Sequence, residues 1–246
     1  MSFKKLSSIS LTDQFVNELQ RMILSGELKA GDQLPPEREL AETMGVSLAV
    51  VNNGVRRLQE RGFLHVAPRK GVFVADYLRE GNINTLEAVL EYGEDYYSRD
   101  IISALVAFRR SFEAPVTVTA CEICTSENLA YIEDAVTRFH AETDADALGE
   151  LAFEVHRSIA AASENVVYAL IIASFRPIYV SSYRTALGLE DRAPIDMFFD
   201  NLLDCVREHD GERAQTILLK TIDTWEQMFG ATYSEGAPYR AEQTDS

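Results

Sequence analysis

Two cysteines have a spacing that could support chemistry. Cys121 and Cys124 form a CxxC pair, a pattern found in redox and zinc sites. A reactive thiol usually needs a helix N-terminus that lowers its pKa, and a zinc site needs a second ligand pair. This pair falls late in an expected long helix, and only Cys205 remains among the 3 cysteines of the chain. We therefore interpret both as small buried apolar residues.

Three other polar residues have the side-chain types of a hydrolase site but not the sequence motifs that accompany one. Glu150, His156 and Ser158 supply an acid, a base and a hydroxyl. No nucleophile elbow, phosphate-binding loop or paired-histidine motif accompanies them. We expect no enzymatic activity and no cofactor. The odd and small number of cysteines excludes a disulfide scaffold and favours a reducing cytoplasm.

The charge of the chain is divided unevenly. The net charge is −16, which at first argues against a nucleic-acid partner. Residues 1–76 hold 10 Lys and Arg against 9 Asp and Glu, whereas residues 77–246 hold 13 against 30. Attraction to phosphate can therefore be local to the first third of the chain, with the acidic remainder facing away from DNA.

The first third has the pattern of a winged helix-turn-helix. Apolar residues at helical spacing run from Phe15 to Ile23, and a second short helix is expected after Pro36. The stretch Gly45–Gly62 follows as the second half of a helix-turn-helix, with Ser47 as its cap. Alternating apolar residues then flank a Pro-Arg-Lys-Gly turn, which predicts a two-stranded hairpin with a basic tip.

The rest of the chain is predicted to be an all-helical bundle. Helical patterns separated by Gly, Pro and Ser breakers cover 84–92, 98–124, 126–141, 144–163, 165–187, 194–208 and 211–229. The expected organisation is a winged helix-turn-helix domain at 1–76, a linker at 77–83, an all-helical domain at 84–230 and a disordered tail at 231–246. The fold class is thus mainly α, with an α+β winged helix-turn-helix before an all-α helical bundle. No apolar run is long enough for a membrane helix.

Two stretches resemble a known family of regulators. The segment ILSGELKAGDQLPPERELAETMGVS resembles the N-terminal signature of the GntR family of bacterial transcription regulators. The segments ADALGELAFEVHRSIAAASENVVYALI and IYVSSYR are similar to the ligand-sensing domain of the FadR group, whose best-known branch responds to fatty acyl-CoA. The resemblance implies a homodimer that binds a near-palindromic DNA operator and releases it when a small metabolite occupies the helical domain.

The recognition helix departs from the family pattern. Such regulators usually read DNA with an arginine in the preceding helix, then a hydroxyl, Arg and Thr at the start of the recognition helix and another Arg one turn on. Arg38 and Ser47 keep the first two roles. The remaining positions hold Leu48, Ala49, Val50 and Asn52. Each missing bidentate Arg–guanine contact removes roughly 1–3 kcal/mol of base discrimination.

Side chains able to contact DNA nevertheless remain. Asn52 can pair with adenine, and Leu48 or Ala49 can contact a thymine methyl group, which favours an A·T-leaning operator. Gly54 costs about 1 kcal/mol relative to Ala, so this helix relies on packing. The expected phosphate or minor-groove contacts are Arg56, Arg57, Arg69, Lys70 and Gly71. The alternative is a non-DNA-binding interaction or sensor protein built on the same scaffold.

The metal site of many relatives is not expected here. The resemblance implies an acidic residue, a histidine four positions on, and two later histidines. His156 matches the first histidine, but Ala152, Phe199 and Thr221 stand at the other positions. One imidazole cannot make a three- or four-ligand site, so we expect no metal.

An apolar effector pocket is expected instead. The stretch 165–183 is strongly apolar and serves either as a pocket wall or as a central core helix, with a kink at Pro177. Leu219, Lys220 and Thr221 depart from the fatty-acid-responsive pattern and disfavour CoA recognition more than an apolar chain. The resemblance implies an acyl-CoA or fatty acid as the partner, because Arg109, Arg184, Tyr179 and Trp225 match positions of the fatty-acid-responsive relatives. The expected ligand contacts are these four residues together with His156 and Tyr183.

Overall fold

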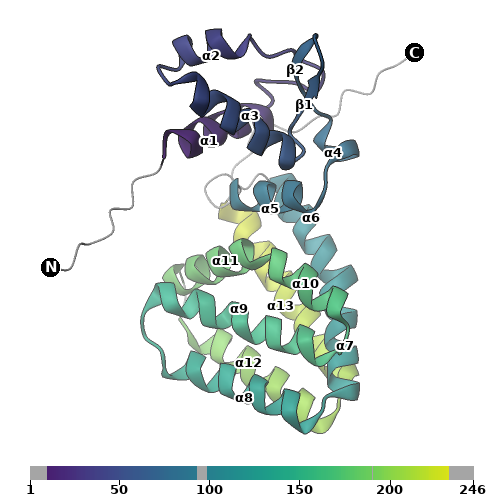
Figure 1. The fold of residues 1–246 in the computed structure, drawn as a ribbon. Helices are drawn as coiled ribbons and strands as arrows, with labels where there is room; N and C mark the ends of the chain where they lie inside the picture. Colours follow the sequence, from purple (N-terminus) through teal and green to yellow (C-terminus); the bar gives the residue numbers. More distant parts are fainter. Residues whose placement is uncertain (1–9, 93–98, 190, 233–246) are drawn as a thin grey trace, which may run out of the picture. The chain divides into compact units, whose positions relative to one another are not determined.

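The computed structural model describes residues 10–92, 99–189 and 191–232, which belong to two compact units divided after Tyr92 (Figure 1). The N-terminal unit contains helices and one two-stranded sheet, and the described part of the C-terminal unit is entirely helical. The predicted fold class is therefore confirmed.

The N-terminal unit is a winged helix-turn-helix. Its elements are α1 (Leu11–Leu24), α2 (Glu37–Thr43), α3 (Leu48–Glu60), β1 (Leu64–Ala67) and β2 (Gly71–Val74). The two strands pair antiparallel, with Leu64 opposite Val74 and Ala67 opposite Gly71. The loop before α2 adds to this ribbon, since the Leu34 amide donates to the Val72 carbonyl at 2.9 Å.

Side-chain caps fix where the two longer helices of this unit begin. The Ser10 hydroxyl accepts from the Asp13 amide at 3.1 Å, and the Asp13 carboxylate accepts in return from the Ser10 amide, a capping box before α1. Ser47 caps α3 as predicted, because its Oγ accepts from the Val50 amide at 3.3 Å. The recognition helix therefore has a defined first turn.

Helices α1 and α3 pack closely enough to explain the glycine in the recognition helix. Phe15 is 2% exposed, and its ring lies against Gly54. A Cβ atom at Gly54 would lie 2.2 Å from Phe15 Cδ1, well inside contact distance. The helix propensity lost at Gly54 is therefore offset by the seating of a fully buried aromatic ring.

Two further helices belong to the N-terminal unit. In α5 (Ile83–Tyr92), Ala88 is 1% exposed and its carbonyl accepts from Gln20 Nε2 at 2.8 Å. Thr85 Oγ1 donates to the Arg61 carbonyl at 2.7 Å, and the short helix α4 (Tyr77–Glu80) precedes this contact. The structure thus differs from the expected linker at 77–83 and from a second domain beginning at 84, because contacts of α5 with α1 and with the end of α3 hold these residues to the first unit.

The C-terminal unit contains the helices that the sequence pattern predicts, with two interruptions. Its elements are α6 (Arg99–Phe108), a π-helical segment (Arg109–Glu113), α7 (Ala114–Ile123), α8 (Ser126–Ala141), α9 (Ala145–Ala162), α10 (Val166–Ser174), α11 (Arg176–Leu189), α12 (Ala193–Glu208) and α13 (Gly211–Thr232). Helix α9 packs against α7, α8, α10 and α11, and its buried residues form the centre of this unit.

The expected helix over 165–187 is broken rather than continuous. Helices α10 and α11 meet at Phe175 with a bend of 57°. Pro177 lies in the first turn of α11, where its missing amide hydrogen is tolerated but cannot continue α10. The predicted distortion at Pro177 is therefore confirmed, and it produces two separate helices.

Helix α13 is the last described element of the chain. It continues through Thr232, so residues 231 and 232 of the expected tail at 231–246 are helical, and residues 233–246 lie outside the described residues. Among the described helices none is by itself long and apolar enough to cross a membrane; the bent pair α10–α11 passes that test by length and composition only.

Replacing Gly54 by alanine is expected to destabilise the N-terminal unit by about 1–3 kcal/mol, because the added methyl overlaps the Phe15 ring. Urea unfolding followed by circular dichroism measures the change. Asn53→Ala, at an exposed neighbouring position of α3, is the matched control and should stay within about 0.5 kcal/mol of the parent. Equal stabilities for the two variants would contradict the packing described for α1 and α3.

Candidate nucleic-acid interface and effector cavity

The first turn of α3 presents an apolar and amide surface to solvent. Leu48 is 39% exposed, and Ala49 and Asn52 are exposed as well. Val50 is half-buried and packs against the core of the unit. The side chains available to a base edge on this turn are therefore a leucine, an alanine and an asparagine.

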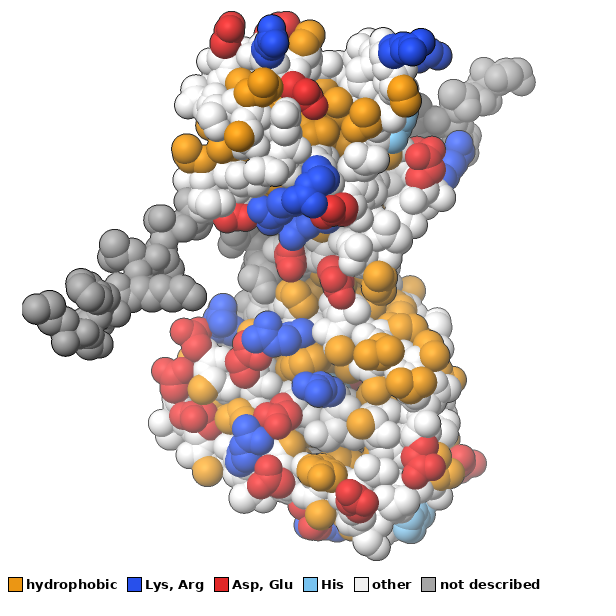
Figure 2. Space-filling model, viewed as in Figure 1, with side chains coloured by type: hydrophobic (Ala, Val, Ile, Leu, Met, Phe, Trp, Pro, Cys, Tyr) orange, Lys and Arg blue, Asp and Glu red, His pale blue; other side chains and the backbone are white. Residues whose placement is uncertain are grey.

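The basic tip of the hairpin is exposed and conformationally fixed. Cationic side chains gather there in Figure 2. Arg69 adopts a positive φ of 64° in the turn, and Gly71 follows at 123°, where a Cβ atom would lie 2.7 Å from Gln33 Nε2. That amide donates to the Lys70 carbonyl at 2.7 Å. The turn geometry and this hydrogen bond fix the wing backbone, so that the Arg69 and Lys70 side chains project from a defined position.

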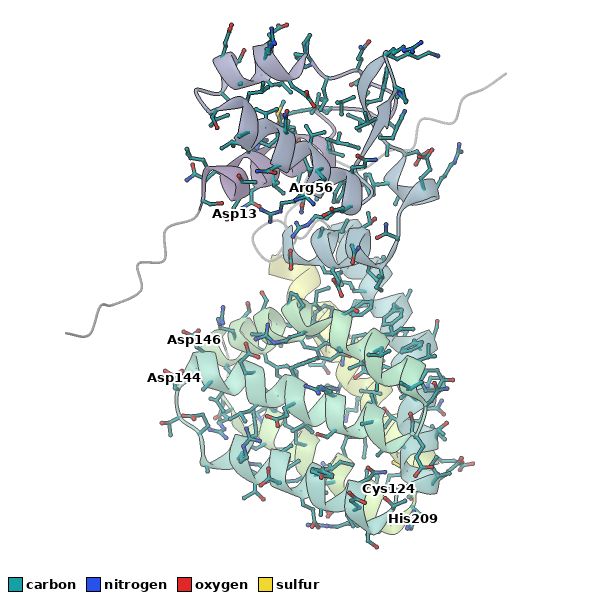
Figure 3. All side chains as sticks on the ribbon, viewed as in Figure 1. Asp13, Arg56, Cys124, Asp144, Asp146 and His209 are labelled. Carbon is teal, nitrogen blue, oxygen red and sulfur yellow. The ribbon has the colours of Figure 1, made fainter. Side chains whose placement is uncertain are left out.

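The two arginines on α3 differ in their partners. Arg57 Nη1 lies 2.6 Å from Asp13 Oδ1, whereas Arg56 pairs with Glu60 of its own helix at 3.2 Å; Asp13 and Arg56 are labelled in Figure 3. The Ser10 hydroxyl and then Arg57 lower the pKa of Asp13 to about 2. Arg57 therefore links α3 to the cap of α1, a contact that the sequence pattern does not predict; its expected phosphate or minor-groove contact stays a prediction.

Some cations of the N-terminal unit form no ion pair within the described residues. They lie on α2 and on the wing, the hairpin formed by β1 and β2. Arg38, Arg69 and Lys70 are exposed and make no salt bridge in the described part of the chain. A cation without a partner gives up no ion pair when it binds a phosphate. These three residues thus form the electrostatic part of the candidate DNA surface.

The cysteine pair does not form a reactive site. Cys121 is buried, and burial raises the pKa of its thiol to about 12. Cys124 is half-buried at the end of α7, near His209 at the end of α12 (Figure 3). The His209 ring lies 2.8 Å from the Cys121 carbonyl. The interpretation as a small apolar residue is confirmed for Cys121, and Cys124 is more exposed than expected.

The C-terminal unit encloses a cavity of about 440 Å³. This volume lies in the range of pockets that hold small organic ligands. Its apolar lining comes from α11, α12 and α13, and the apolar residues are Ile178, Ala186, Pro194, Ile195, Met197, Phe198, Ile217, Trp225 and Met228. The polar lining residues are Arg109, Tyr179, Ser182, Tyr183, Asn201, Lys220, Thr221 and Thr224.

A charged network is buried at one side of this cavity. Arg109 Nε donates to Glu113 Oε2 at 2.6 Å, and His156 Nδ1 lies 2.7 Å from Glu113 Oε1. The other ring nitrogen of His156 lies 2.7 Å from the Tyr183 hydroxyl. The guanidinium carbon of Arg109 also lies 5.2 Å from the centre of the Tyr179 ring. Arg109, Glu113 and His156 are at most 7% exposed, so the ion pair lies in the interior.

A local change of helix type positions this ion pair. The chain widens into a π-helical segment from Arg109 to Glu113 and returns to α-helix at Ala114. Pro115 has no amide hydrogen, so the regular i to i−4 bond to Ser111 cannot form, and such interruptions accompany π-turns. Both charged side chains that form the pair are buried against the inside of the unit.

The charge states of the network follow from burial and from its internal contacts. Burial alone would raise the pKa of Glu113, but Arg109 and then His156 outweigh it and hold that pKa well below its usual range. Burial opposes the charge on Arg109, and Glu113 outweighs this effect, so the pKa of Arg109 is raised. Burial lowers the pKa of His156. A neutral His156 can donate from Nδ1 to Glu113 and accept from the Tyr183 hydroxyl.

The donor set around His156 does not fit a metal ion. Ala152 and Phe199 are fully buried, and the Phe199 ring centre lies 5.8 Å from that of His156. The hydroxyl of Thr221 donates to the Ile217 carbonyl of its own helix. In the described part of the chain, no three His, Cys, Asp or Glu side chains are arranged to hold a metal ion. An internal carboxylate and guanidinium surround this histidine instead.

Most of the predicted effector residues are brought together. Four of the six line the cavity, namely Arg109, Tyr179, Tyr183 and Trp225. His156 is not among the lining residues, and its ring centre lies 4.7 Å from that of Tyr179. The sixth predicted residue does not join them. Arg184 is half-exposed and pairs at 2.8 Å with Asp146, which Figure 3 labels at the start of α9. Arg184 is absent from the lining of this cavity because its partner holds it at the surface.

Two functional candidates are not evident from the sequence pattern. Glu113 is one, and its only signal is a carboxylate four residues after Arg109, a spacing that is common on exposed helix faces. Lys220 is the other, an exposed cation on α13 that lines the cavity. In the sequence, Lys220 stands out only as a departure from the fatty-acid-responsive pattern, which predicts no contact for it.

Comparison with known proteins identifies both units. Residues 11–74 match the model of the bacterial regulatory proteins of the gntR family, and residues 104–224 match the model of the FCD domain. The chain is a GntR-family regulator with an FCD domain. Both matches fall within the units described above, the first covering α1 to β2 and the second running from α6 into α13.

Individual relatives agree with this assignment over most of their length. The galactonate operon transcriptional repressor of Escherichia coli (strain K12) is 28% identical over 220 residues, covering 87% of this chain and 95% of the relative. The fatty acid metabolism regulator protein of Proteus mirabilis (strain HI4320) is 25% identical over 225 residues, covering 86% and 91%. A solved structure of Lar, which is described as controlling expression of the Listeria monocytogenes agr system, has a TM-score of 0.65 at 16% identity, covering 94% and 100%.

Replacing Glu113 by glutamine in this GntR-family regulator is expected to destabilise the FCD-containing unit by about 3–5 kcal/mol, because a buried guanidinium is left without its counter-charge. Urea unfolding measures the decrease. Glu150→Gln removes a surface partner of Arg176 and serves as the control, with an expected change below about 1 kcal/mol. A Glu113→Gln protein as stable as the control would show that the buried pair does not depend on its carboxylate.

Proposed function

We propose that this protein acts in the cytoplasm as a homodimer that binds a two-fold DNA operator through its winged helix, and that a fatty acid or long-chain acyl-CoA in the FCD cavity alters this binding. The observation that carries the proposal is the presence of exposed, unpaired wing cations in one unit and of an apolar cavity in the other. Effector binding would shift the population between two dimer arrangements that differ in the spacing of the recognition helices.

The DNA contacts would divide into positioning and base readout. Arg38, Arg69 and Lys70 would hold phosphates or enter the minor groove, and they supply affinity without much sequence information. Asn52 would read adenine, and Leu48 would contact a thymine methyl group. The operator preference is therefore expected to lean toward A·T pairs, in contrast to regulators that read guanine with arginine.

The cavity supports an apolar effector more than a polar one. Its lining is dominated by aliphatic and aromatic side chains, and the cations that line it are Arg109 and Lys220. A sugar acid would leave hydroxyl groups against this apolar wall, at a cost in desolvation. The phosphates of CoA would need several cations, so the free acid fits this lining better than its thioester.

The apolar first turn of α3 gives a second candidate some support. With Leu48 and Ala49 exposed where arginine and threonine usually stand, the protein could act as an interaction or sensor protein that no longer binds DNA. This alternative predicts no salt-dependent affinity for DNA, whereas the first candidate predicts it, because every phosphate contact releases counterions.

The double variant Arg69→Ala, Lys70→Ala is expected to weaken binding to DNA from the protein's own promoter region, similarly for all sequences. The slope of log affinity against log salt should fall by roughly 0.9 for each phosphate that the variant no longer neutralises. Fluorescence anisotropy at several salt concentrations provides both values. Arg213→Ala, which removes a surface cation of the helical unit paired with Glu208, is the control and should change neither.

Adding palmitate or palmitoyl-CoA to the parent protein is expected to weaken operator binding in the same titration. The proposed regulator is overturned by a parent protein that shows no salt-dependent DNA binding at micromolar concentration.

The variant Leu48→Arg, Asn52→Arg is expected to bind a typical GntR-family operator that the parent binds weakly, because it restores two guanidinium groups able to contact guanine. The increase should reach roughly 1–3 kcal/mol for each restored guanine contact. Comparative anisotropy on the family operator and on a scrambled duplex measures it. Unchanged affinity for both duplexes would favour the scaffold that no longer binds DNA.

A further inference from the structure

Three buried side-chain atoms at this side of the cavity have no hydrogen-bond partner within the described part of the chain, namely Nη2 of Arg109, the hydroxyl of Tyr179 and Oε1 of Glu113. Arg109 and Tyr179 line the cavity, whereas Glu113 is not among its lining residues. Arg109 is 7% exposed and Tyr179 is 3% exposed, so neither reaches bulk solvent easily. Buried donors are nearly always paired in native proteins, and an unpaired one at a cavity indicates a missing acceptor.

The remaining contacts of these residues define which atoms are available. The Nε atom of Arg109 already donates to Glu113. The guanidinium carbon of Arg109 lies 5.2 Å from the centre of the Tyr179 ring and 5.7 Å from that of the Trp225 ring. Burial and then the nearby Glu113 carboxylate raise the pKa of Tyr179, so its hydroxyl stays protonated and can donate. The cavity wall therefore presents an N–H donor of Arg109 and the O–H donor of Tyr179, and the acceptor oxygens of a ligand would satisfy both.

We propose that Arg109 Nη2 and the Tyr179 hydroxyl form a metal-free subsite for the carboxylate of a monocarboxylic acid, whose apolar body lies against the α11, α12 and α13 wall. This inference rests on the proposed function, since it specifies how the effector of the FCD cavity is held. It also agrees with a donor set around His156 that does not fit a metal, because the N–H of Arg109 and the O–H of Tyr179 can donate to a carboxylate where no metal ligates it.

The number of donors and the local charge favour a single carboxylate. Its two oxygens can accept from the two orphan donors, in the way that planar anions bind arginine. Because Glu113 already balances the charge of Arg109, every negative charge of a ligand is added to the interior, and one such charge costs less than two. A doubly charged phosphate is therefore a poorer occupant than a monoanionic carboxylate.

The rest of the cavity specifies the body of the ligand. Phe198 and Ile178 are buried on the wall, and Trp225 and Met228 line it from α13. A volume of about 440 Å³ accommodates a medium-length chain. Decanoate is therefore a suitable probe, and decanol is the matching probe without a charge.

The experiment is isothermal titration of the full chain with decanoate and decanol, near neutral pH and in the presence of EDTA. Decanoate should bind at least roughly ten-fold more tightly than decanol, because hydrogen bonds to a charged group are the stronger kind. Tyr179→Phe removes only a hydroxyl, and it should weaken decanoate binding roughly ten-fold while leaving decanol unchanged.

A charge-balanced variant and a surface control complete the test. Arg109→Met combined with Glu113→Gln removes both buried charges together and should abolish the preference for decanoate over decanol. Arg184→Ala removes a cation that pairs with Asp146 outside the cavity lining and should leave both affinities unchanged.

Several results would overturn the subsite. They are equal affinities for decanoate and decanol, an unchanged decanoate affinity in Tyr179→Phe, binding that requires a metal and fails in EDTA, or no binding of either probe. The salt-dependent DNA titration is independent of all these results. A result that overturns the carboxylate subsite can therefore be told apart from one that overturns the proposed DNA-binding function.

Discussion

The buried ion pair between Arg109 and Glu113 is the constraint on which the helical unit depends. Two charges in a protein interior are costly unless each is paired and hydrogen-bonded. Here the carboxylate contacts both the guanidinium and the His156 ring, and the tyrosines of α11 surround them. The helices that supply these groups must therefore keep their positions relative to one another. The π-helical segment carries the ion pair, α9 carries His156, and α11 carries Tyr179 and Tyr183.

The same network explains how an FCD domain can lack the ligands of a metal site. The positions expected to supply them are filled by Ala152 and Phe199, which are buried and apolar. The Phe199 ring packs against His156, whose two ring nitrogens lie 2.7 Å from Glu113 Oε1 and from the Tyr183 hydroxyl. The positive charge close to the cavity is then a fixed guanidinium. We propose that this arginine takes the place of a metal ion in holding the effector.

How far the sequence predicts this structure depends on the range of the interaction. The winged helix and most helices of the second unit follow from local periodicity, caps such as Ser47 and breakers such as Pro177, because these signals act within a few residues. The partner of Arg57 is Asp13, 44 residues away, and nothing in either local pattern specifies that pair. The sequence pattern places the unit boundary too early for the same reason, since Ala88 is held by Gln20 of the first helix. The role of Glu113 is hidden in the sequence because its burial depends on other helices.

We propose that the effector enters the cavity as a carboxylate and remains ionised beside Arg109. The most direct measurement is carbon NMR of decanoate labelled at its carboxyl carbon, bound to the full chain and titrated from neutral to mildly acidic pH. A bound resonance that keeps the chemical shift of an ionised carboxylate below the pH at which free decanoate protonates is the predicted result. A bound resonance that shows the protonated acid, or that titrates as free decanoate does, would contradict the account.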